Sequence, residues 1–223
     1  MAWMPPIPIT VDPRTIFFIL EVIAIHSFAL SGLVVARTHK MDAVGTFIAV
    51  FLVAFGGGTL RDLLLDTRPF YWVKHNYLLW VLLIMSVLAS LTLKISSKLV
   101  SNRLALVTDA IGLGIFSATG TQMALQLDWP PLPAVMIGVI TATFGGLLRD
   151  IVCNQKPMLL TDPVPYATCA FFGNWLLLGL LAMGWFDVFW SVSIAAAFIA
   201  LLRIVVYALD IRMPQLDGGD NSQ

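Results

Sequence analysis

Charged side chains are scarce in this sequence. Lys, Arg, Asp and Glu together make up 12% of the 223 residues, and their formal charges cancel, whereas a soluble domain carries about 25%. Because nucleic-acid binding relies on a basic surface, this balance predicts no nucleic-acid partner. Hydrophobic residues reach 59% instead, and the mean hydropathy is +0.89, which is typical of a membrane protein.

Residues that carry metal or enzymatic chemistry are also few. Cys153 and Cys169 lie in or beside apolar runs, and the three histidines do not cluster with them. We therefore interpret both cysteines as packing residues and expect no metal and no other cofactor. The segment "GGGT" lacks the preceding strand and the Gly-Lys-Ser/Thr ending of a phosphate loop. Since no Ser-His-Asp set, HExxH motif or paired-carboxylate site is recognisable either, we expect no enzyme.

Long apolar runs are abundant. About 20 apolar residues span the core of a bilayer. Seven runs are candidates for such spans, and the two that end at glycines reach this length only if the helix continues through the glycines. The sequence therefore predicts an all-α, polytopic membrane protein with seven transmembrane helices in one domain over residues 1–210, and a disordered cytoplasmic tail over 211–223. The runs are Ile16–Val35, Val44–Phe55, Leu78–Leu93, Leu104–Leu127, Leu132–Leu148, Ala167–Met183 and Val188–Leu209.

The basic residues predict the orientation of these helices. Cytoplasmic loops carry an excess of Lys and Arg, so we expect the N-terminus outside and the C-terminus in the cytoplasm. The side predicted to be cytoplasmic holds Arg37, Lys40, Lys94, Lys98, Arg103, Lys156 and Arg212, and the other side holds Arg14, Arg68 and Lys74.

The sequence is duplicated with an offset of 88 residues, as "GGGTLRDLLLDTRP" at 56–69 returns as "GGLLRDIVCNQKP" at 145–157. The repeats cover residues 15–93 and 103–183, and the seventh helix, 187–209, lies outside them. Because each repeat has three helices, the second copy must be inverted, which is an architecture of transport proteins. Matching pairs include Gly57/Gly145, Gly58/Gly146, Arg61/Arg149, Asp62/Asp150, Pro69/Pro157, Gly32/Gly120, Ser31/Thr119 and Glu21/Asp109.

The glycines of the duplicated motif allow two interpretations. Small residues let transmembrane helices approach closely, so the glycines could serve packing alone. Consecutive glycines also weaken a helix by about 1 kcal/mol each and are a known site of kinks. We favour a kink or break in helices 2 and 5, whose freed carbonyls would form a polar waist suited to a cation. The glycines are Gly56, Gly57, Gly58, Gly145 and Gly146.

The Arg-Asp pairs also have two interpretations. Arg61 lies about 10 Å from the centre of its helix and could snorkel to the interface, whereas the shorter Asp62 cannot. Intramembrane charges usually face a bundle interior or a cavity, so we expect Arg61 and Asp62, and Arg149 and Asp150, to guard the two mouths of a path. Inversion places the pairs on opposite sides of the waist, which argues against an Arg61–Asp150 bridge.

Several other polar residues are candidates for lining the path. Glu21 and Asp109 lie about one and a half turns into their helices, where capping or interfacial solvation is an equal alternative. Ser31, Thr119, Thr121 and Thr141 could face a pore, although Ser and Thr in a helix more often bond to its own backbone.

The duplicated GG-x-L-R-D, placed on the second helix of each three-helix repeat and followed by one extra helix, resembles the prokaryotic trimeric intracellular cation (TRIC) channels over residues 15–210. The resemblance implies a homotrimer in the inner membrane of a prokaryote, with a pore in each protomer between kinked helices 2 and 5. It implies monovalent cations, chiefly potassium, and membrane lipid as partners. The same sequences carry a glycine transporter label, so a secondary transporter for a small zwitterion such as glycine is the alternative.

Overall fold

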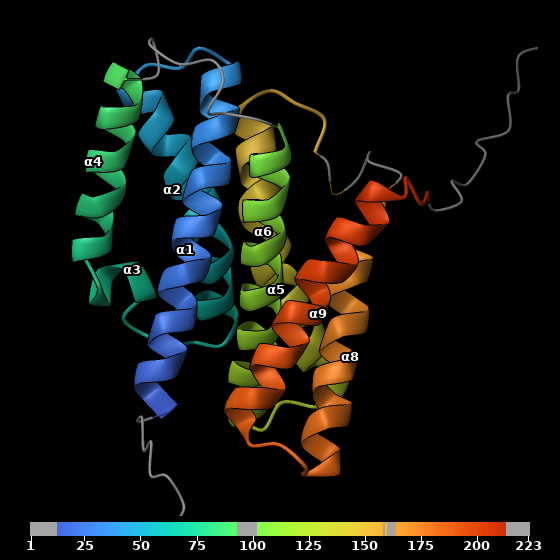
Figure 1. The fold of residues 1–223 in the computed structure, drawn as a ribbon. Coiled ribbons are helices and arrows are strands. Elements are labelled where there is room, and N and C mark those ends of the chain that lie inside the picture. Colours follow the sequence, from blue (N-terminus) through green and yellow to red (C-terminus); the bar gives the residue numbers. More distant parts are fainter. Residues whose placement is uncertain (1–12, 93–101, 158, 160–163, 213–223) are drawn as a thin grey trace, which may run out of the picture.

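The computed structural model of the protein describes residues 13–92, 102–157, 159 and 164–212, and every regular element in these ranges is a helix (Figure 1). The predicted all-α class is thus confirmed, while Lys94, Lys98 and the tail from residue 213 lie outside the described residues. The helices are α1 (Pro13–Thr38), α2 (Ala43–Leu64), α3 (Tyr71–Lys74), α4 (Tyr77–Thr92), α5 (Asn102–Gln126), α6 (Pro131–Val152), α8 (Ala167–Met183) and α9 (Val188–Ala208).

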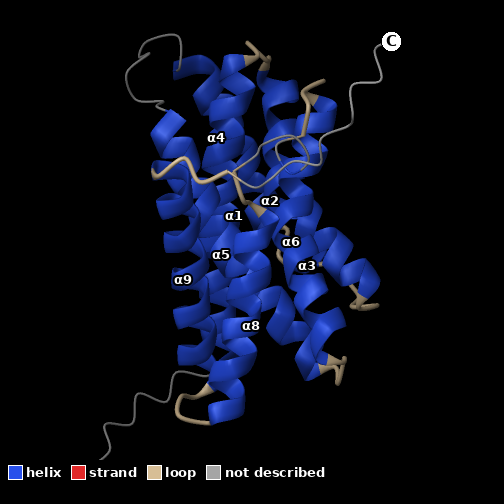
Figure 2. Ribbon diagram, turned by 90° about the vertical axis from the view of Figure 1, so that its right-hand side faces the viewer, coloured by secondary structure: helices blue, strands red, loops and turns tan. Residues whose placement is uncertain are grey.

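The long helices form one bundle in which consecutive members run in opposite directions (Figure 1). Four helices make its centre: α1 packs on α2 and α5, and α6 packs on the same two helices from the other side. On one flank α4 covers α2, and on the other α8 and α9 pack on each other and on α5 (Figures 1 and 2). The second and fifth predicted spans, α2 and α6, are therefore in direct contact at the middle of the bundle.

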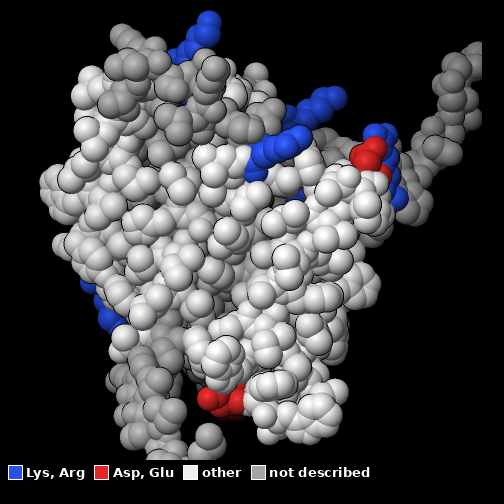
Figure 3. Space-filling model, in the orientation of Figure 1, with Lys and Arg blue, Asp and Glu red and all other residues white. Residues whose placement is uncertain are grey.

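The outer surface of the bundle is apolar. Five helices (α1, α2, α5, α6 and α9) are long and apolar enough to cross a membrane, and α4 and α8 are shorter apolar helices. Large hydrophobic side chains such as Trp80 and Leu201 are more than 60% exposed, as expected where the neighbour is lipid. The described basic side chains gather mainly at the end where α1 and α6 finish (Figure 3). The chain is a multi-pass membrane protein.

The backbone conformation at the helix ends repeats with the same 88-residue offset as the sequence. Left-handed backbone occurs at Lys40 and Asp128, and again at Asp66 and Asn154, and each pair is separated by 88 residues. The amide of Thr67 donates to the carbonyl of Asp62 at 2.8 Å, and the amide of Gln155 donates to that of Asp150 at the same distance. The duplicated motif therefore builds two copies of one helix ending.

The predicted break of helices 2 and 5 is wrong. Residues 43–64 form one uninterrupted α-helix through Gly56–Gly58, and residues 131–152 do so through Gly145 and Gly146. Tertiary packing overrides the weak helix propensity of glycine here, because the missing side chains allow the contact described next. A kink without loss of helical structure stays a prediction.

Candidate functional site

The two glycine motifs lie where α2 and α6 cross. A Cβ atom on Gly57 would overlap the carbonyl oxygen of Thr141, and one on Gly145 would overlap that of Val53. Because 57 and 145 differ by the same 88 residues as 53 and 141, the two halves of the crossing are equivalent. Backbone touches backbone at this point, so the packing interpretation describes Gly57 and Gly145.

Gly58 and Gly146 differ from their neighbours. The nearest atoms to a Cβ on Gly58 lie 3.9 Å away and belong to the Arg61 guanidinium, and a Cβ on Gly146 finds the Arg149 guanidinium at the same distance. These two glycines are therefore not needed for the helix contact. They leave room beside each arginine.

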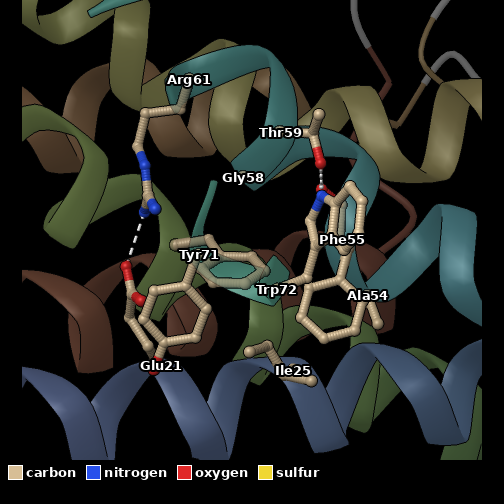
Figure 4. A pocket seen from close by; sticks show the side chains of 10 residues that line it. Glu21, Ile25, Ala54, Phe55, Gly58, Thr59, Arg61, Tyr71 and Trp72 are labelled. Carbon is tan, nitrogen blue, oxygen red and sulfur yellow. Dashed lines mark hydrogen bonds and ion pairs between the residues drawn. The ribbon is translucent and has the colours of Figure 1, made fainter. Parts of the chain in front are cut away.

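The first arginine cluster comprises Arg61, Glu21, Asp62 and Tyr71. Figure 4 shows Arg61, Glu21 and Tyr71. Arg61 is 1% exposed, and its Nη1 lies 2.6 Å from Oε1 of Glu21 while its Nη2 lies 2.8 Å from Oδ1 of Asp62. The second Asp62 oxygen accepts a 2.9 Å hydrogen bond from the backbone amide of Tyr71, at the start of α3. Arg61 thus joins α1 and α2 and does not snorkel to the interface.

The second arginine cluster comprises Arg149, Asp150, Asp109 and Tyr166, with Ser31 beside them. Arg149 is 4% exposed, and its Nη2 lies 2.8 Å from Oδ1 of Asp150. Its Nη1 donates to the hydroxyl of Ser31 on α1 at 3.4 Å. Each arginine therefore pairs with the aspartate that follows it, and Arg61 and Asp150 belong to different clusters, as inversion predicted.

A small cavity adjoins each cluster. The first is bordered by Glu21, Gly58, Arg61 and Tyr71 and the second by Asp109, Gly146, Arg149, Asp150 and Tyr166. Each measures about 10 Å³, which is room for about one water molecule. Since α2 and α6 run in opposite directions, the two cavities lie on opposite sides of the glycine crossing.

A wider hollow leads to the first cluster. It measures about 730 Å³ and is bordered by Glu21 and Tyr71 together with Thr119 and Gln126 of α5. A second hollow of about 560 Å³ lies near the other end of α1, bordered by Arg37, Lys40 and Thr46 among others. Glu21 borders both the large hollow and the small cavity, so it connects Arg61 with the outside of the bundle.

The remaining candidate residues, Thr119, Thr121 and Thr141, are all buried. The hydroxyls of Thr119 and Thr141 donate to the carbonyls of Ile115 and Ile137 in their own helices, as the alternative to pore lining predicted. The Thr121 hydroxyl is buried, and it has no hydrogen-bond partner among the described residues.

Sequence reasoning missed four polar contributors: Tyr71, Tyr166, Arg203 and Asn174. Tyr71 and Tyr166 complete the two cavities, but they lie outside the 88-residue register, which hid their similar roles. Arg203 of α9 is 1% exposed and donates to the carbonyl of Pro165 at 3.0 Å. An arginine inside the last apolar run is a strong signal in itself. The amide of Asn174 on α8 donates to the Ser117 hydroxyl on α5 at 2.9 Å.

Known proteins resemble the chain over most of its length. The family model described as "Glycine transporter" matches it twice, at residues 18–94 and 106–182. A UPF0126 membrane protein of Vibrio cholerae is 35% identical over 77% of this chain and 71% of its own length. The UPF0126 inner membrane protein YadS of Escherichia coli is 36% identical over 70% of this chain and 74% of its own length.

Solved structures show the same fold. The TRIC trimeric intracellular cation channel orthologue from Rhodobacter sphaeroides has a TM-score of 0.79 at 30% identity and is matched over 88% of this chain and all of its own. A prokaryotic TRIC channel crystallised in 0.5 M KCl has a TM-score of 0.80 at 25% identity, over 90% of this chain and all of its own. The chain therefore belongs to the prokaryotic TRIC family, whose domain is described as glycine transporter and which includes the UPF0126 membrane proteins.

Proposed function

We propose that the protein is a monovalent cation channel, chiefly for potassium, which assembles as a homotrimer with one pore in each protomer. The pore follows the α2–α6 crossing. One observation carries this proposal: two buried arginine clusters, each with a polar cavity, lie on opposite sides of the point where Gly57 and Gly145 bring two helix backbones together. The solved structures that resemble the chain are of cation channels, which supports the same function.

The proposed membrane arrangement has seven spans. In addition to the five long helices, the shorter α4 and α8 cross the bilayer, so that α1, α2 and α4 form one repeat and α5, α6 and α8 its inverted copy. The two family-model matches begin and end 88 residues apart, which supports this division. The extra helix is α9, and the pseudo-two-fold axis passes through the glycine crossing.

The crossing is closed in this structure. The carbonyls of Thr141 and Val53 lie against the glycine backbones, and each adjoining cavity holds no more than about one water. A potassium ion passes only if α2 and α6 separate at this point. Conduction therefore requires a conformational change that widens the crossing and joins the two cavities.

Purified protein in planar bilayers tests the proposal. We expect unitary current steps whose reversal potential follows a potassium gradient. The alternative, a secondary transporter for a small zwitterion, is suggested by the description of the family model. Saturable glycine exchange into vesicles without current steps would establish that alternative and reject the channel.

The proposed topology, with the N-terminus outside and the C-terminus in the cytoplasm, has its own test. Thr38 and Asn76 are exposed at opposite ends of the bundle. On a background in which Cys153 and Cys169 are alanine, Asn76→Cys should react with an impermeant thiol reagent in intact cells, and Thr38→Cys should react only after lysis. The reverse pattern would invert the orientation and exchange the two mouths.

A further inference from the structure

Arg203 is a buried charge on the helix that lies outside the duplication. It belongs to α9, and its side chain is almost completely shielded, with 1% of the residue exposed. Because α9 has no copy in the sequence, the duplication supplies no counterpart of Arg203 beside the first arginine cluster. Intramembrane arginines are usually found where they serve a site or a partner, so the contacts of Arg203 indicate its function.

Arg203 contacts the segment that enters α8. Its Nη1 donates to the carbonyl of Pro165 at 3.0 Å, and its Cζ lies 4.9 Å from the centre of the Tyr166 ring. Tyr207, one turn further along α9, has its ring centre 5.9 Å from the same atom. A planar guanidinium can donate a hydrogen bond and stack on aromatic rings at the same time, which an ammonium cannot do equally well.

Tyr166 forms a wall of the second cavity. It is buried and borders that cavity together with Asp109, Arg149 and Asp150. Its hydroxyl reaches to 3.9 Å from the position of a Cβ on Gly146. Arg203 therefore holds Tyr166 from one side while the tyrosine faces the glycine motif of α6 on the other.

Tyr71, at the first cavity, is held by different means. Its backbone amide is bound to Asp62 at 2.9 Å, and its ring centre lies 4.3 Å from that of His75. Both restraints come from within the first repeat. Each cavity thus has a tyrosine in its wall, and among the described residues it is the tyrosine of the second cavity that contacts a helix outside the repeats.

We propose that Arg203 is a positioning residue that keeps Tyr166 in the second cavity, so that α9 sets how readily this mouth opens. The inference rests on the proposed channel function. A cavity with room for about one water cannot pass a hydrated cation unless Tyr166 moves. Moving the ring breaks its contact with Arg203, and this contact therefore stabilises the closed state.

Single-channel recording in planar bilayers tests the proposal. We expect Arg203→Met to raise the open probability about tenfold, the scale of a desolvated cation–π contact, while the unitary current stays the same. Tyr166→Leu should act in the same direction, and the double variant should add little, because both changes remove the same contact between Arg203 and Tyr166. Arg212→Met is the matched control, since Arg212 is 65% exposed and paired with Asp210, and it should gate as the wild type does.

A second readout does not depend on current. The thiol of buried Cys169 donates to the carbonyl of Pro165 at 3.3 Å, so release of this segment exposes it. With Cys153 replaced by alanine, Arg203→Met should accelerate labelling of Cys169 by a small thiol reagent about tenfold, by the same cation–π scale. If the wild type carries no unitary current, the channel function fails, while the labelling rate still decides whether Arg203 restrains the segment.

Three results would overturn the proposal: unchanged gating and labelling in Arg203→Met, fully additive effects in the double variant, or a lower yield of assembled protein with normal gating. If the methionine variant does not assemble, Arg203→Lys replaces it. Lysine keeps the charge and a donor but loses the planar stacking, so a smaller increase in open probability is expected. Wild-type gating in Arg203→Lys would then reject the role of Arg203.

Discussion

Alanine at Gly57 is expected to disrupt the protein, whereas alanine at the adjacent Gly58 is expected to be tolerated. A methyl group on Gly57 would overlap the Thr141 carbonyl oxygen, which is backbone and cannot turn away, but one on Gly58 has no neighbour closer than 3.9 Å. Overpacking typically costs about 1–3 kcal/mol, and a backbone clash belongs at the upper end. Thermal unfolding of the purified protein in detergent should show a large loss for Gly57→Ala and little change for Gly58→Ala.

The second repeat supplies a matched pair of variants. Gly145→Ala overlaps the Val53 carbonyl oxygen, while Gly146→Ala is 3.9 Å from its nearest atoms, so the same contrast should appear. Equal stability of all four variants would show that the crossing is looser than the structure indicates. Loss of current in a fully stable Gly58→Ala protein would support a functional kink, because alanine raises helix propensity by about 1 kcal/mol without a clash.

The helices and the repeat could be predicted from the sequence because both depend on local information. An apolar run of bilayer length has few alternatives to a helix, and the Arg-Asp motif is rare enough in apolar sequence to fix the offset. The equal helix endings at Asp66 and Asn154 follow from that offset. Tyr166 was not predicted because it lies seven residues beyond the position that corresponds to Tyr71 in the second repeat.

The sequence could not decide between the two interpretations of the glycines because the deciding contact comes from a neighbouring helix. Propensity alone favours a break at Gly56–Gly58, but the carbonyl that fills the space beside Gly57 belongs to Thr141, far away in the sequence. The backbone contact between the two helices offsets the low helix propensity of glycine.

The pairing of Arg61 could not be predicted from the sequence for a related reason. Residues one apart diverge by about 100° around a helix, so their adjacency does not by itself predict a contact. A long arginine side chain can bend across that angle, and in the structure it does so, with Nη2 2.8 Å from Oδ1 of Asp62. The snorkelling interpretation assumed that the side chain of Arg61 faces lipid, whereas in the structure it faces Glu21 of α1.

Replacing Arg61 with methionine is therefore expected to prevent stable assembly, and not simply to alter conduction. The change removes the cation between two buried carboxylates, Glu21 and Asp62, which are 6% and 2% exposed. Breaking a buried ion pair in this way costs about 3–5 kcal/mol, because the remaining charge is left uncompensated. The measurement is the yield of assembled protein on size exclusion, followed by thermal unfolding of any protein recovered.

Neutralising the carboxylates should restore assembly, and this rescue separates electrostatics from simple loss of packing. The variant with Arg61→Met, Glu21→Gln and Asp62→Asn leaves no buried charge in the first cluster, and its amides can still accept hydrogen bonds such as the one from the Tyr71 amide. Arg68→Met serves as the control for a cation at the same end of α2, because Arg68 is exposed and lies 4.1 Å from the Phe70 ring centre. It should assemble normally.

The rescued variant also tests whether the first cluster serves conduction. With the fold restored and the charges gone, a path that runs past Arg61 should carry a different unitary potassium current, because a fixed charge beside a narrow passage changes the local concentration of ions. Arg149→Met combined with Asp150→Asn and Asp109→Asn makes the equivalent change on the other side of the crossing, so the two variants should shift rectification in opposite directions. If both rescued proteins carry wild-type currents, the arginine clusters only stabilise the fold, and the ions must follow a route other than the α2–α6 crossing.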